Sequence, residues 1–191
     1  MFADIMMRLG VLSSIAAFCL CIPMHGAAAP VSVNATAGAA FAGEAVNVAL
    51  LEIRRDVTAH FSLAAAAGYL DVAGGRDEGQ LRLMAIGTWN IHGWAIDNRH
   101  LLSLSTESVE RYRIRARVAR PGLFGLRSLS ARAFDEGFVD LDGAGFIRNN
   151  IALGVGFELN RAVLAEFYRV WEGNRDAPND RYVLGLVTVR F

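Results

Sequence analysis

The chain has 191 residues, of which 53% are hydrophobic, and its 19 positive side chains balance its 19 negative ones. A net charge of zero gives no overall field to attract a polyanion, so we expect no nucleic-acid partner. All the positive residues are arginines, which keep their charge out of water and pair with carboxylates through two parallel hydrogen bonds.

The first 28 residues have the three-part pattern of a secretory signal peptide. Arg8 gives a positive charge, Leu9–Met24 is apolar, and the small residues around Ala28 permit cleavage after it. The apolar stretch is interrupted by Pro23 and is shorter than the roughly 20 residues that a membrane-spanning helix needs. We therefore expect export, and a single mature domain over residues 31–191.

Both cysteines, Cys19 and Cys21, fall in the predicted signal peptide. The mature chain therefore has no thiol with which to form a disulfide or bind a metal. The histidines that remain after cleavage are dispersed, at positions 60, 92 and 100, which argues against a zinc site. We expect no metal and no cofactor.

The mature chain consists of stretches in which apolar and polar residues alternate. Side chains alternate between the two faces of a β-strand, so each stretch predicts a strand with one apolar and one polar face. Ten strands of an all-β, closed, antiparallel up-and-down barrel are predicted, with eight as the alternative if the first two runs form fewer strands. The predicted strands are residues 31–41, 45–54, 58–70, 80–91, 94–107, 109–118, 126–138, 146–159, 163–172 and 181–191.

The third stretch shows the pattern most clearly. Its apolar face runs without interruption from Phe61 to Tyr69, while His60 and Ser62 begin a face of small and polar residues. The fifth stretch places Asp97 on its polar face but leaves two polar residues on the apolar one, Asn98 and His100, for which the pattern offers no explanation.

Residues 109–118 place four arginines on one face and Tyr112, Ile114 and Ala116 on the other. An arginine that faces lipid at mid-depth costs about 2–4 kcal/mol, so four would cost as much as a fold's whole stability. In a membrane barrel the arginines must face the lumen, where we expect Arg113 and Arg115 to form ion pairs with inward carboxylates such as Glu136 on the neighbouring strand. In a soluble, lipocalin-like barrel they would face water instead.

Three features favour the membrane barrel over the soluble periplasmic one. Aromatic residues lie near the ends of the apolar faces, as in the two girdles of outer-membrane barrels. The polar faces mix small and charged residues, as a filled lumen requires. Phe191 ends the last strand, which is typical of bacterial outer-membrane barrels, and we interpret it as an assembly signal.

The connections suggest an orientation. Four of them are short, as periplasmic turns are, and three others are longer and rich in Gly, Asp and Asn, as outer loops are. The short ones lie at residues 55–56, 92–93, 121–125 and 160–161, and the long ones at 73–79, 139–145 and 173–180. Two further connections on the predicted outer side, near Gly43 and Ser108, are also short, so the regularity is imperfect.

The second half of the chain resembles a family of uncharacterised bacterial outer-membrane proteins, the domain of unknown function twenty-four ninety. The resemblance rests on Asp97-Asn98-Arg99, the run Tyr112 to Arg117, Phe134-Asp135-Glu136, Arg148-Asn149 and the closing residues Arg181 to Phe191. It implies a signal peptide and a barrel, and neither a reaction nor a cofactor.

We therefore predict an outer-membrane barrel with a structural, small-solute or interaction role and a charged, largely plugged lumen. Its expected partners are outer-membrane lipid and the barrel-assembly machinery, and the sequence identifies no small-molecule ligand. The predicted lumen charges are Asp97, Arg99, Arg111, Arg113, Arg115, Arg117, Arg132, Glu136, Arg148 and Glu158. The predicted girdle residues are Phe61, Tyr69, Trp89, Trp94, Tyr112 and Trp171.

A barrel enzyme that acts on envelope lipid is the alternative function. Such an enzyme needs a histidine within hydrogen-bonding distance of a serine, and His60 with Ser62 on one face is the first candidate. No neighbouring sequence supports catalysis, so we do not expect an enzyme. The stretch from Asp140 to Gly143 resembles part of a calcium loop but lacks the later ligands, and we interpret it as a polar turn.

Overall fold

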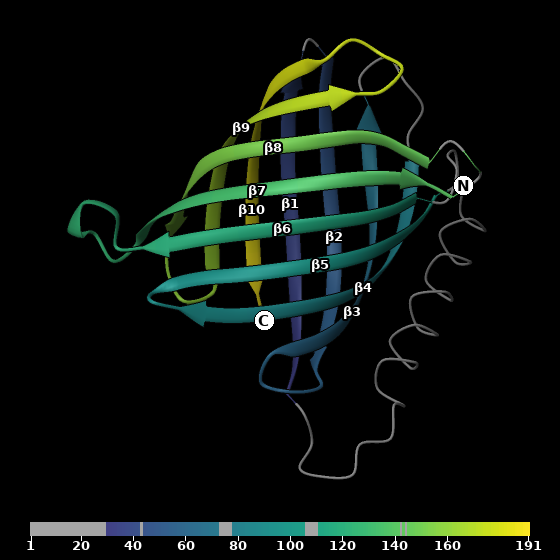
Figure 1. Cartoon of the computed structure of the whole chain (residues 1–191). Helices are drawn as coiled ribbons and strands as arrows, with labels where there is room; N and C mark the ends of the chain where they lie inside the picture. Colours follow the sequence, from purple (N-terminus) through teal and green to yellow (C-terminus); the bar gives the residue numbers. More distant parts are fainter. Residues whose placement is uncertain (1–29, 43, 73–77, 106–110, 142, 144) are drawn as a thin grey trace.

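The computed structural model describes residues 30–42, 44–72, 78–105, 111–141, 143 and 145–191. The predicted signal peptide therefore lies outside the described residues. The described chain forms ten strands, shown in Figure 1. They are β1 (Val31–Ala42), β2 (Glu44–Asp56), β3 (Phe61–Val72), β4 (Glu78–Ile91), β5 (Trp94–Ser105), β6 (Arg111–Pro121), β7 (Leu129–Asp140), β8 (Gly145–Glu158), β9 (Val163–Asn174) and β10 (Asp180–Arg190).

The strands close into one barrel. Each strand pairs antiparallel with the next along the chain, and β1 also pairs with β10. The ten-stranded, antiparallel, up-and-down barrel predicted from the sequence is thus confirmed over its alternative of eight strands. Within the described part of the chain, no helix is long and apolar enough to cross a membrane.

The strands are strongly tilted, and the register shows the direction of the tilt. One row of paired residues begins at Asp56, at the end of β2 that lies beside the start of β1, and passes through Arg115 in the middle of β6. It continues to Asp180 at the opposite end of β10. We call the end of the barrel at which β1 begins and β10 ends the terminus side, and the other end the loop side. A step to the next strand along such a row therefore rises towards the loop side.

Two predicted strands begin later than expected, because turns occupy their first residues. β3 begins at Phe61, since the backbone N–H groups of Val57 and Thr58 both bond to the carbonyl of Phe61 and close a turn. β7 begins at Leu129, after a short 3-10 turn at Leu123–Gly125 that the sequence did not predict.

Among the connections that the structure describes in full, the predicted difference in length between the two ends is not seen. The two-residue turn at His92 and Gly93 is tight, with φ of 50° and 78°, as hairpins of this kind require. The connection that contains the 3-10 turn, residues 122–128, lies on the same terminus side and is longer than the loop-side connection 175–179. Connection length therefore does not identify the periplasmic end.

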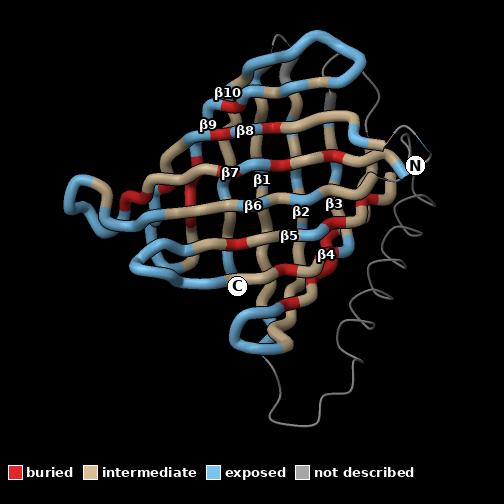
Figure 2. The backbone as a smooth tube through the Cα atoms, in the orientation of Figure 1, coloured by how far each residue is buried: buried red, intermediate tan, exposed pale blue. Residues whose placement is uncertain are grey.

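Large apolar residues cover the outside of the barrel, and two smaller apolar clusters lie within it. In Figure 2 the longest exposed stretches lie at the strand ends, whereas buried positions occur along the strands. One internal cluster joins β3, β4 and β5 and consists of Ala64, Ala66, Met84, Ile86 and Leu101. The other joins β7, β8 and β9 and consists of Phe134, Ala152, Tyr168 and Val170.

Candidate functional site

The charged faces of the strands point into the lumen. Arg117 on β6 lies 3.5 Å from Glu166 on β9, and Arg99 on β5 lies 3.8 Å from Glu52 on β2. Neither pair of strands is adjacent in the sheet, so these contacts cross the interior. This is the arrangement of a membrane barrel and the opposite of the lipocalin-like alternative, in which the arginines face water.

One group of ion pairs links strands around much of the lumen on the terminus side, and we call it the terminus-side network. Asp97 lies 2.5 Å from Arg117 and 3.1 Å from Arg99. Glu166 lies 2.5 Å from Arg132 and 3.5 Å from Arg117, and it accepts a hydrogen bond of 2.7 Å from the Tyr168 hydroxyl. Because Arg99 also reaches Glu52, the network ties together β2, β5, β6, β7 and β9.

A second group, the loop-side network, lies towards the other end. Arg113 forms an ion pair of 2.8 Å with Glu136, and Arg148 lies 3.4 Å from Glu172. The guanidinium groups of both arginines lie over the ring of Phe138, at 4.6 and 4.0 Å from its centroid. Phe138 is buried inside the barrel and joins the two ion pairs through cation–π contacts.

Arg115 lies between the two networks and, unlike Arg113 and Arg117 on the same strand, belongs to neither of them. The sequence predicts an ion pair for it, as for Arg113, but among the described residues no carboxylate lies within ion-pair distance of Arg115. Its guanidinium carbon lies 6.0 Å from the centroid of the Phe134 ring. Arg82 likewise has a neutral partner, the Gln80 side-chain oxygen at 2.6 Å.

Glycines make room for these side chains. A Cβ atom at Gly156 would collide with the Arg132 guanidinium and would lie 2.8 Å from the Ser130 hydroxyl oxygen. A Cβ atom at Gly154 would collide with the carbonyl of Phe167 and lie 2.6 Å from the Tyr168 ring. Small residues on the lumen face thus allow large charged and aromatic side chains to fill the interior.

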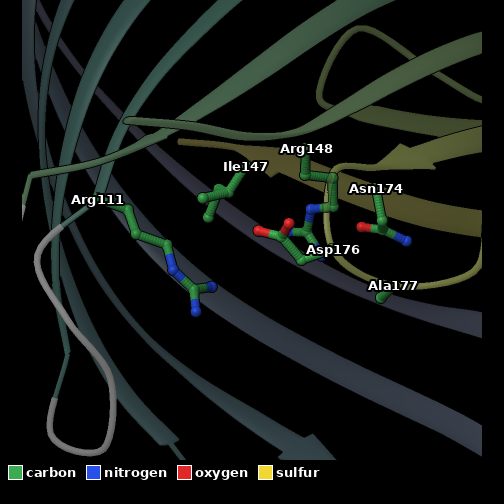
Figure 3. Close-up of a pocket in the computed structure, with 6 residues that line it drawn as sticks. All are labelled: Arg111, Ile147, Arg148, Asn174, Asp176 and Ala177. Atoms are coloured by element: carbon green, nitrogen blue, oxygen red, sulfur yellow. The ribbon is translucent and has the colours of Figure 1, made fainter. Parts of the chain in front are cut away.

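Two of the predicted lumen charges lie at the strand ends and belong to neither network. Glu158, the last residue of β8, is exposed on the terminus side. Arg111, the first residue of β6, lines an open pocket of about 230 Å³ on the loop side, shown in Figure 3. The pocket is also lined by Ile147, Arg148, Asn174, Asp176 and Ala177.

The predicted girdle residues lie on the outer face and at strand ends. Phe61 begins β3, Trp89 lies near the end of β4 and Trp94 begins β5, all on the terminus side. Arg120 lies over the Trp94 ring at 5.2 Å. On the loop side, the predicted residues are Tyr69, Tyr112 and Trp171. Phe191 follows β10 on the terminus side and donates its N–H to the carbonyl of Val33.

The structure does not bring together the predicted catalytic pair. His60 lies in the turn before β3, and its Nδ1 is 3.1 Å from the carbonyl oxygen of Thr88. Ser62 is buried and donates a hydrogen bond of 2.6 Å to Asp56, while Arg54 donates one of 2.8 Å to it. Histidine and serine therefore have separate partners. The described residues contain no group of His, Cys, Asp and Glu side chains suited to a metal; Asp142, part of the suspected calcium-loop fragment, lies outside them.

The sequence missed the apolar and aromatic part of the lumen. Phe134 and Phe138 lie on the inward face of β7 with Arg132 and Glu136, and Ile86 and Val170 are fully buried inside the barrel. The sequence contains a signal for them, because each lies an even number of residues from an inward charged residue on the same strand. The alternation of strand side chains therefore places both on the same face. Glu166 was also missed, since it lies on the strand with the weakest alternation.

No family model matches the chain, and no curated protein matches it. The resemblance to the domain of unknown function twenty-four ninety therefore stays a prediction. Among solved structures, the chain is similar to the NanC porin, with a TM-score of 0.48 and 8% identity over 82% of this chain and 98% of that one. It is also similar to the translocator domain of the autotransporter NalP from Neisseria meningitidis, with a TM-score of 0.45 and 13% identity over 99% and 96% of the two chains.

A third similar structure is the KdgM porin, with a TM-score of 0.51 and 6% identity over 83% of this chain and 99% of that one. Such low identity shows the fold alone. The chain is a closed, antiparallel, up-and-down β-barrel whose fold is similar to that of the KdgM porin.

Proposed function

We propose that this chain is a bacterial outer-membrane barrel with a closed lumen, which acts as a structural or interaction protein through its surfaces. The observation that carries the proposal is the terminus-side network, in which Arg117, Glu166 and Arg132 join three strands across the interior. Fully engaged ion pairs hold long side chains in fixed positions, so they obstruct a path for solutes.

The contents of the lumen away from the network support a closed barrel. Tyr168 bonds to Glu166 and packs edge-on against Phe134, with ring centroids 5.0 Å apart. On the opposite wall, Met84, Ile86 and Leu101 are buried inside the barrel. Apolar side chains that face a lumen remain buried only where they contact other side chains, so they favour a filled interior over a water-filled channel.

The distribution of polar and apolar faces supports the membrane location. Charged side chains gather inside, while outward-facing residues such as Leu51, Leu83 and Val187 are large, apolar and exposed. Exposed apolar surface of this extent requires an apolar environment. We propose that its surroundings are outer-membrane lipid, reached after signal-peptide cleavage and insertion by the assembly machinery.

Conductance across a planar lipid bilayer tests the closed lumen. We expect the purified, folded protein to give no steady current. A variant in which Arg117, Arg132 and Glu166 are all changed to serine removes three long side chains and should conduct. Steady conductance by the unaltered protein, or a serine variant that folds and remains silent, would show that the network does not close the lumen.

A further inference from the structure

Two charged side chains lie on the outer face of the barrel, near the middle of their strands. Asp135 is outward on β7, between the inward residues Phe134 and Glu136. Arg169 is outward on β9, between the inward residues Tyr168 and Val170. Both are exposed. Within the described part of the chain, neither forms a hydrogen bond or an ion pair, so both charges are unsatisfied by the barrel itself.

Such charges are unfavourable against lipid. The cost of a lipid-facing arginine is greatest at the middle of the bilayer and falls to little near its surfaces. Arg169 has Phe167 and Trp171 as its neighbours on the outer face, and Asp135 is paired across the sheet with Ala116 and Ile151. Neither charge lies at a strand end, where water would solvate it.

The two charges lie at nearly the same depth. Asp135 pairs with Ile151, which pairs with Trp171, and Arg169 precedes Trp171 by two residues. Two steps across the sheet cover about 10 Å, and two residues along a strand cover about 7 Å. With strands tilted by about 40°, the step across the sheet from Asp135 to Trp171 moves roughly 6 Å towards the loop side. The step along β9 from Trp171 to Arg169 moves roughly 5 Å back towards the terminus side. Asp135 and Arg169 therefore lie at nearly the same depth.

We propose that two copies of this chain associate through the outer faces of β7, β8 and β9. A two-fold axis parallel to the barrel axis passes beside β8. Asp135 of each copy then pairs with Arg169 of the other, while Ile151 and Leu153 of the two copies pack across the axis. The inference rests on the proposed membrane location, because only lipid makes the unpaired charges costly.

A second copy fits this surface for two reasons. A two-fold contact is self-complementary, and it requires opposite charges on the two sides of the axis, which Asp135 and Arg169 provide. Two copies in one membrane share their orientation, so the paired charges must also lie at equal depth. Between them, Ile151 and Leu153 are 51% and 57% exposed and form an apolar centre.

His100, a polar residue on the outer face of β5, does not compete for this role. The His100 ring nitrogen and the Tyr112 hydroxyl are hydrogen-bonded to each other on the outer face. His100 is therefore satisfied within one copy, unlike Arg169. An axis beside β6 would instead bring Ala116 of the two copies together, which gives a direct alternative to test.

Disulfide cross-linking in outer-membrane fractions tests the interface, with Cys19 and Cys21 changed to alanine in every variant. We expect Leu153→Cys to form a cross-linked dimer on oxidation. Leu51→Cys is the matched control, since Leu51 is also outward, exposed and central on its strand, but lies on β2. The yield from Leu153→Cys should exceed the control by about tenfold or more.

Charge exchange tests the pairing itself. In the Leu153→Cys background, Asp135→Arg alone should reduce cross-linking about tenfold, which corresponds to about 1.4 kcal/mol. Asp135→Arg combined with Arg169→Asp should restore it, because each copy then presents the reversed pair to the other.

Three results would overturn the dimer: cross-linking no greater than that of Leu51→Cys, cross-linking only through Ala116→Cys, or no recovery in the double exchange. Heat-modifiable migration of the monomer from the same fractions reports the membrane barrel separately. A folded barrel in the membrane without cross-linking rejects the dimer and leaves the proposed function standing.

Discussion

Glu166 is the residue of the terminus-side network whose substitution tests the ion pairs most directly. It is 3% exposed and bonds to Arg132 at 2.5 Å, to Arg117 at 3.5 Å and to the Tyr168 hydroxyl at 2.7 Å. Glu166→Gln keeps the size and shape of the side chain and removes its charge. Arg117 retains Asp97 as a partner, but Arg132 loses its carboxylate.

The expected loss of stability follows from that difference. Breaking a buried ion pair by neutralising one member costs about 3–5 kcal/mol, because the other charge stays buried without a partner. The equilibrium constant for unfolding should therefore rise by a factor of about one hundred to several thousand. Replacing both Arg132 and Glu166 by leucine removes both charges, and such exchanges are often close to neutral.

Equilibrium unfolding in urea, with the protein in lipid vesicles, measures both changes. Glu158→Gln is the matched control, since Glu158 is the same residue type but is exposed at the end of β8, and its substitution should change stability by less than about 0.5 kcal/mol. If Glu166→Gln were as mild as Glu158→Gln, or the double leucine variant as damaging as the single one, the ion pair would not be what stabilises this part of the lumen.

Two further predictions concern the packing of the lumen and the alternative function. Gly156→Ala places a methyl group against the Arg132 guanidinium and should destabilise the barrel by about 1–3 kcal/mol in the urea assay. Gly185→Ala is the control, since its Cβ would lie 3.6 Å from the Phe167 ring and should have little effect. Equal effects of the two substitutions would contradict close packing around Gly156. His60→Ala should leave the lipid composition of the envelope unchanged by mass spectrometry, because His60 bonds to the Thr88 carbonyl and not to Ser62, and a lipid change that depends on His60 would restore the enzyme alternative.

The strands and their faces were predictable because one physical rule determines both. In a membrane barrel, the cost of an arginine against lipid fixes the inward face of the run from Arg111 to Arg117, and the period of two then fixes every other side chain on β6. The number of strands was predicted by counting the stretches in which apolar and polar residues alternate. The turns were less predictable, since the 3-10 turn at Leu123–Gly125 depends on backbone conformations that alternation does not report.

The pairing of charges across the lumen could not be predicted, because Glu166 and its partners Arg117 and Arg132 belong to strands that are not adjacent in the sheet. Glu166 contacts arginines on β6 and β7, and that choice depends on the curvature and register of the closed sheet. Both Arg113 and Arg115 were expected to pair with an inward carboxylate such as Glu136 on the neighbouring strand; Arg113 does so, whereas Arg115 has no carboxylate within ion-pair distance among the described residues. On β9, Arg169 weakened the alternation, and the structure shows that it is an outward charge on a regular strand.

The direction of the arginine face is the central claim, and Ile114 and Arg115 test it because they are adjacent on β6 and point to opposite sides. A nitroxide spin label on Ile114→Cys, in lipid vesicles, should collide mainly with oxygen, which dissolves in hydrocarbon, and little with a water-soluble nickel chelate. A label on Arg115→Cys should be shielded from the oxygen dissolved in the bilayer. A label on Arg115→Cys that collides mainly with the nickel chelate, together with a label on Ile114→Cys that is shielded from both reagents, would mean that the arginines face water outside the barrel and that the barrel does not reside in lipid.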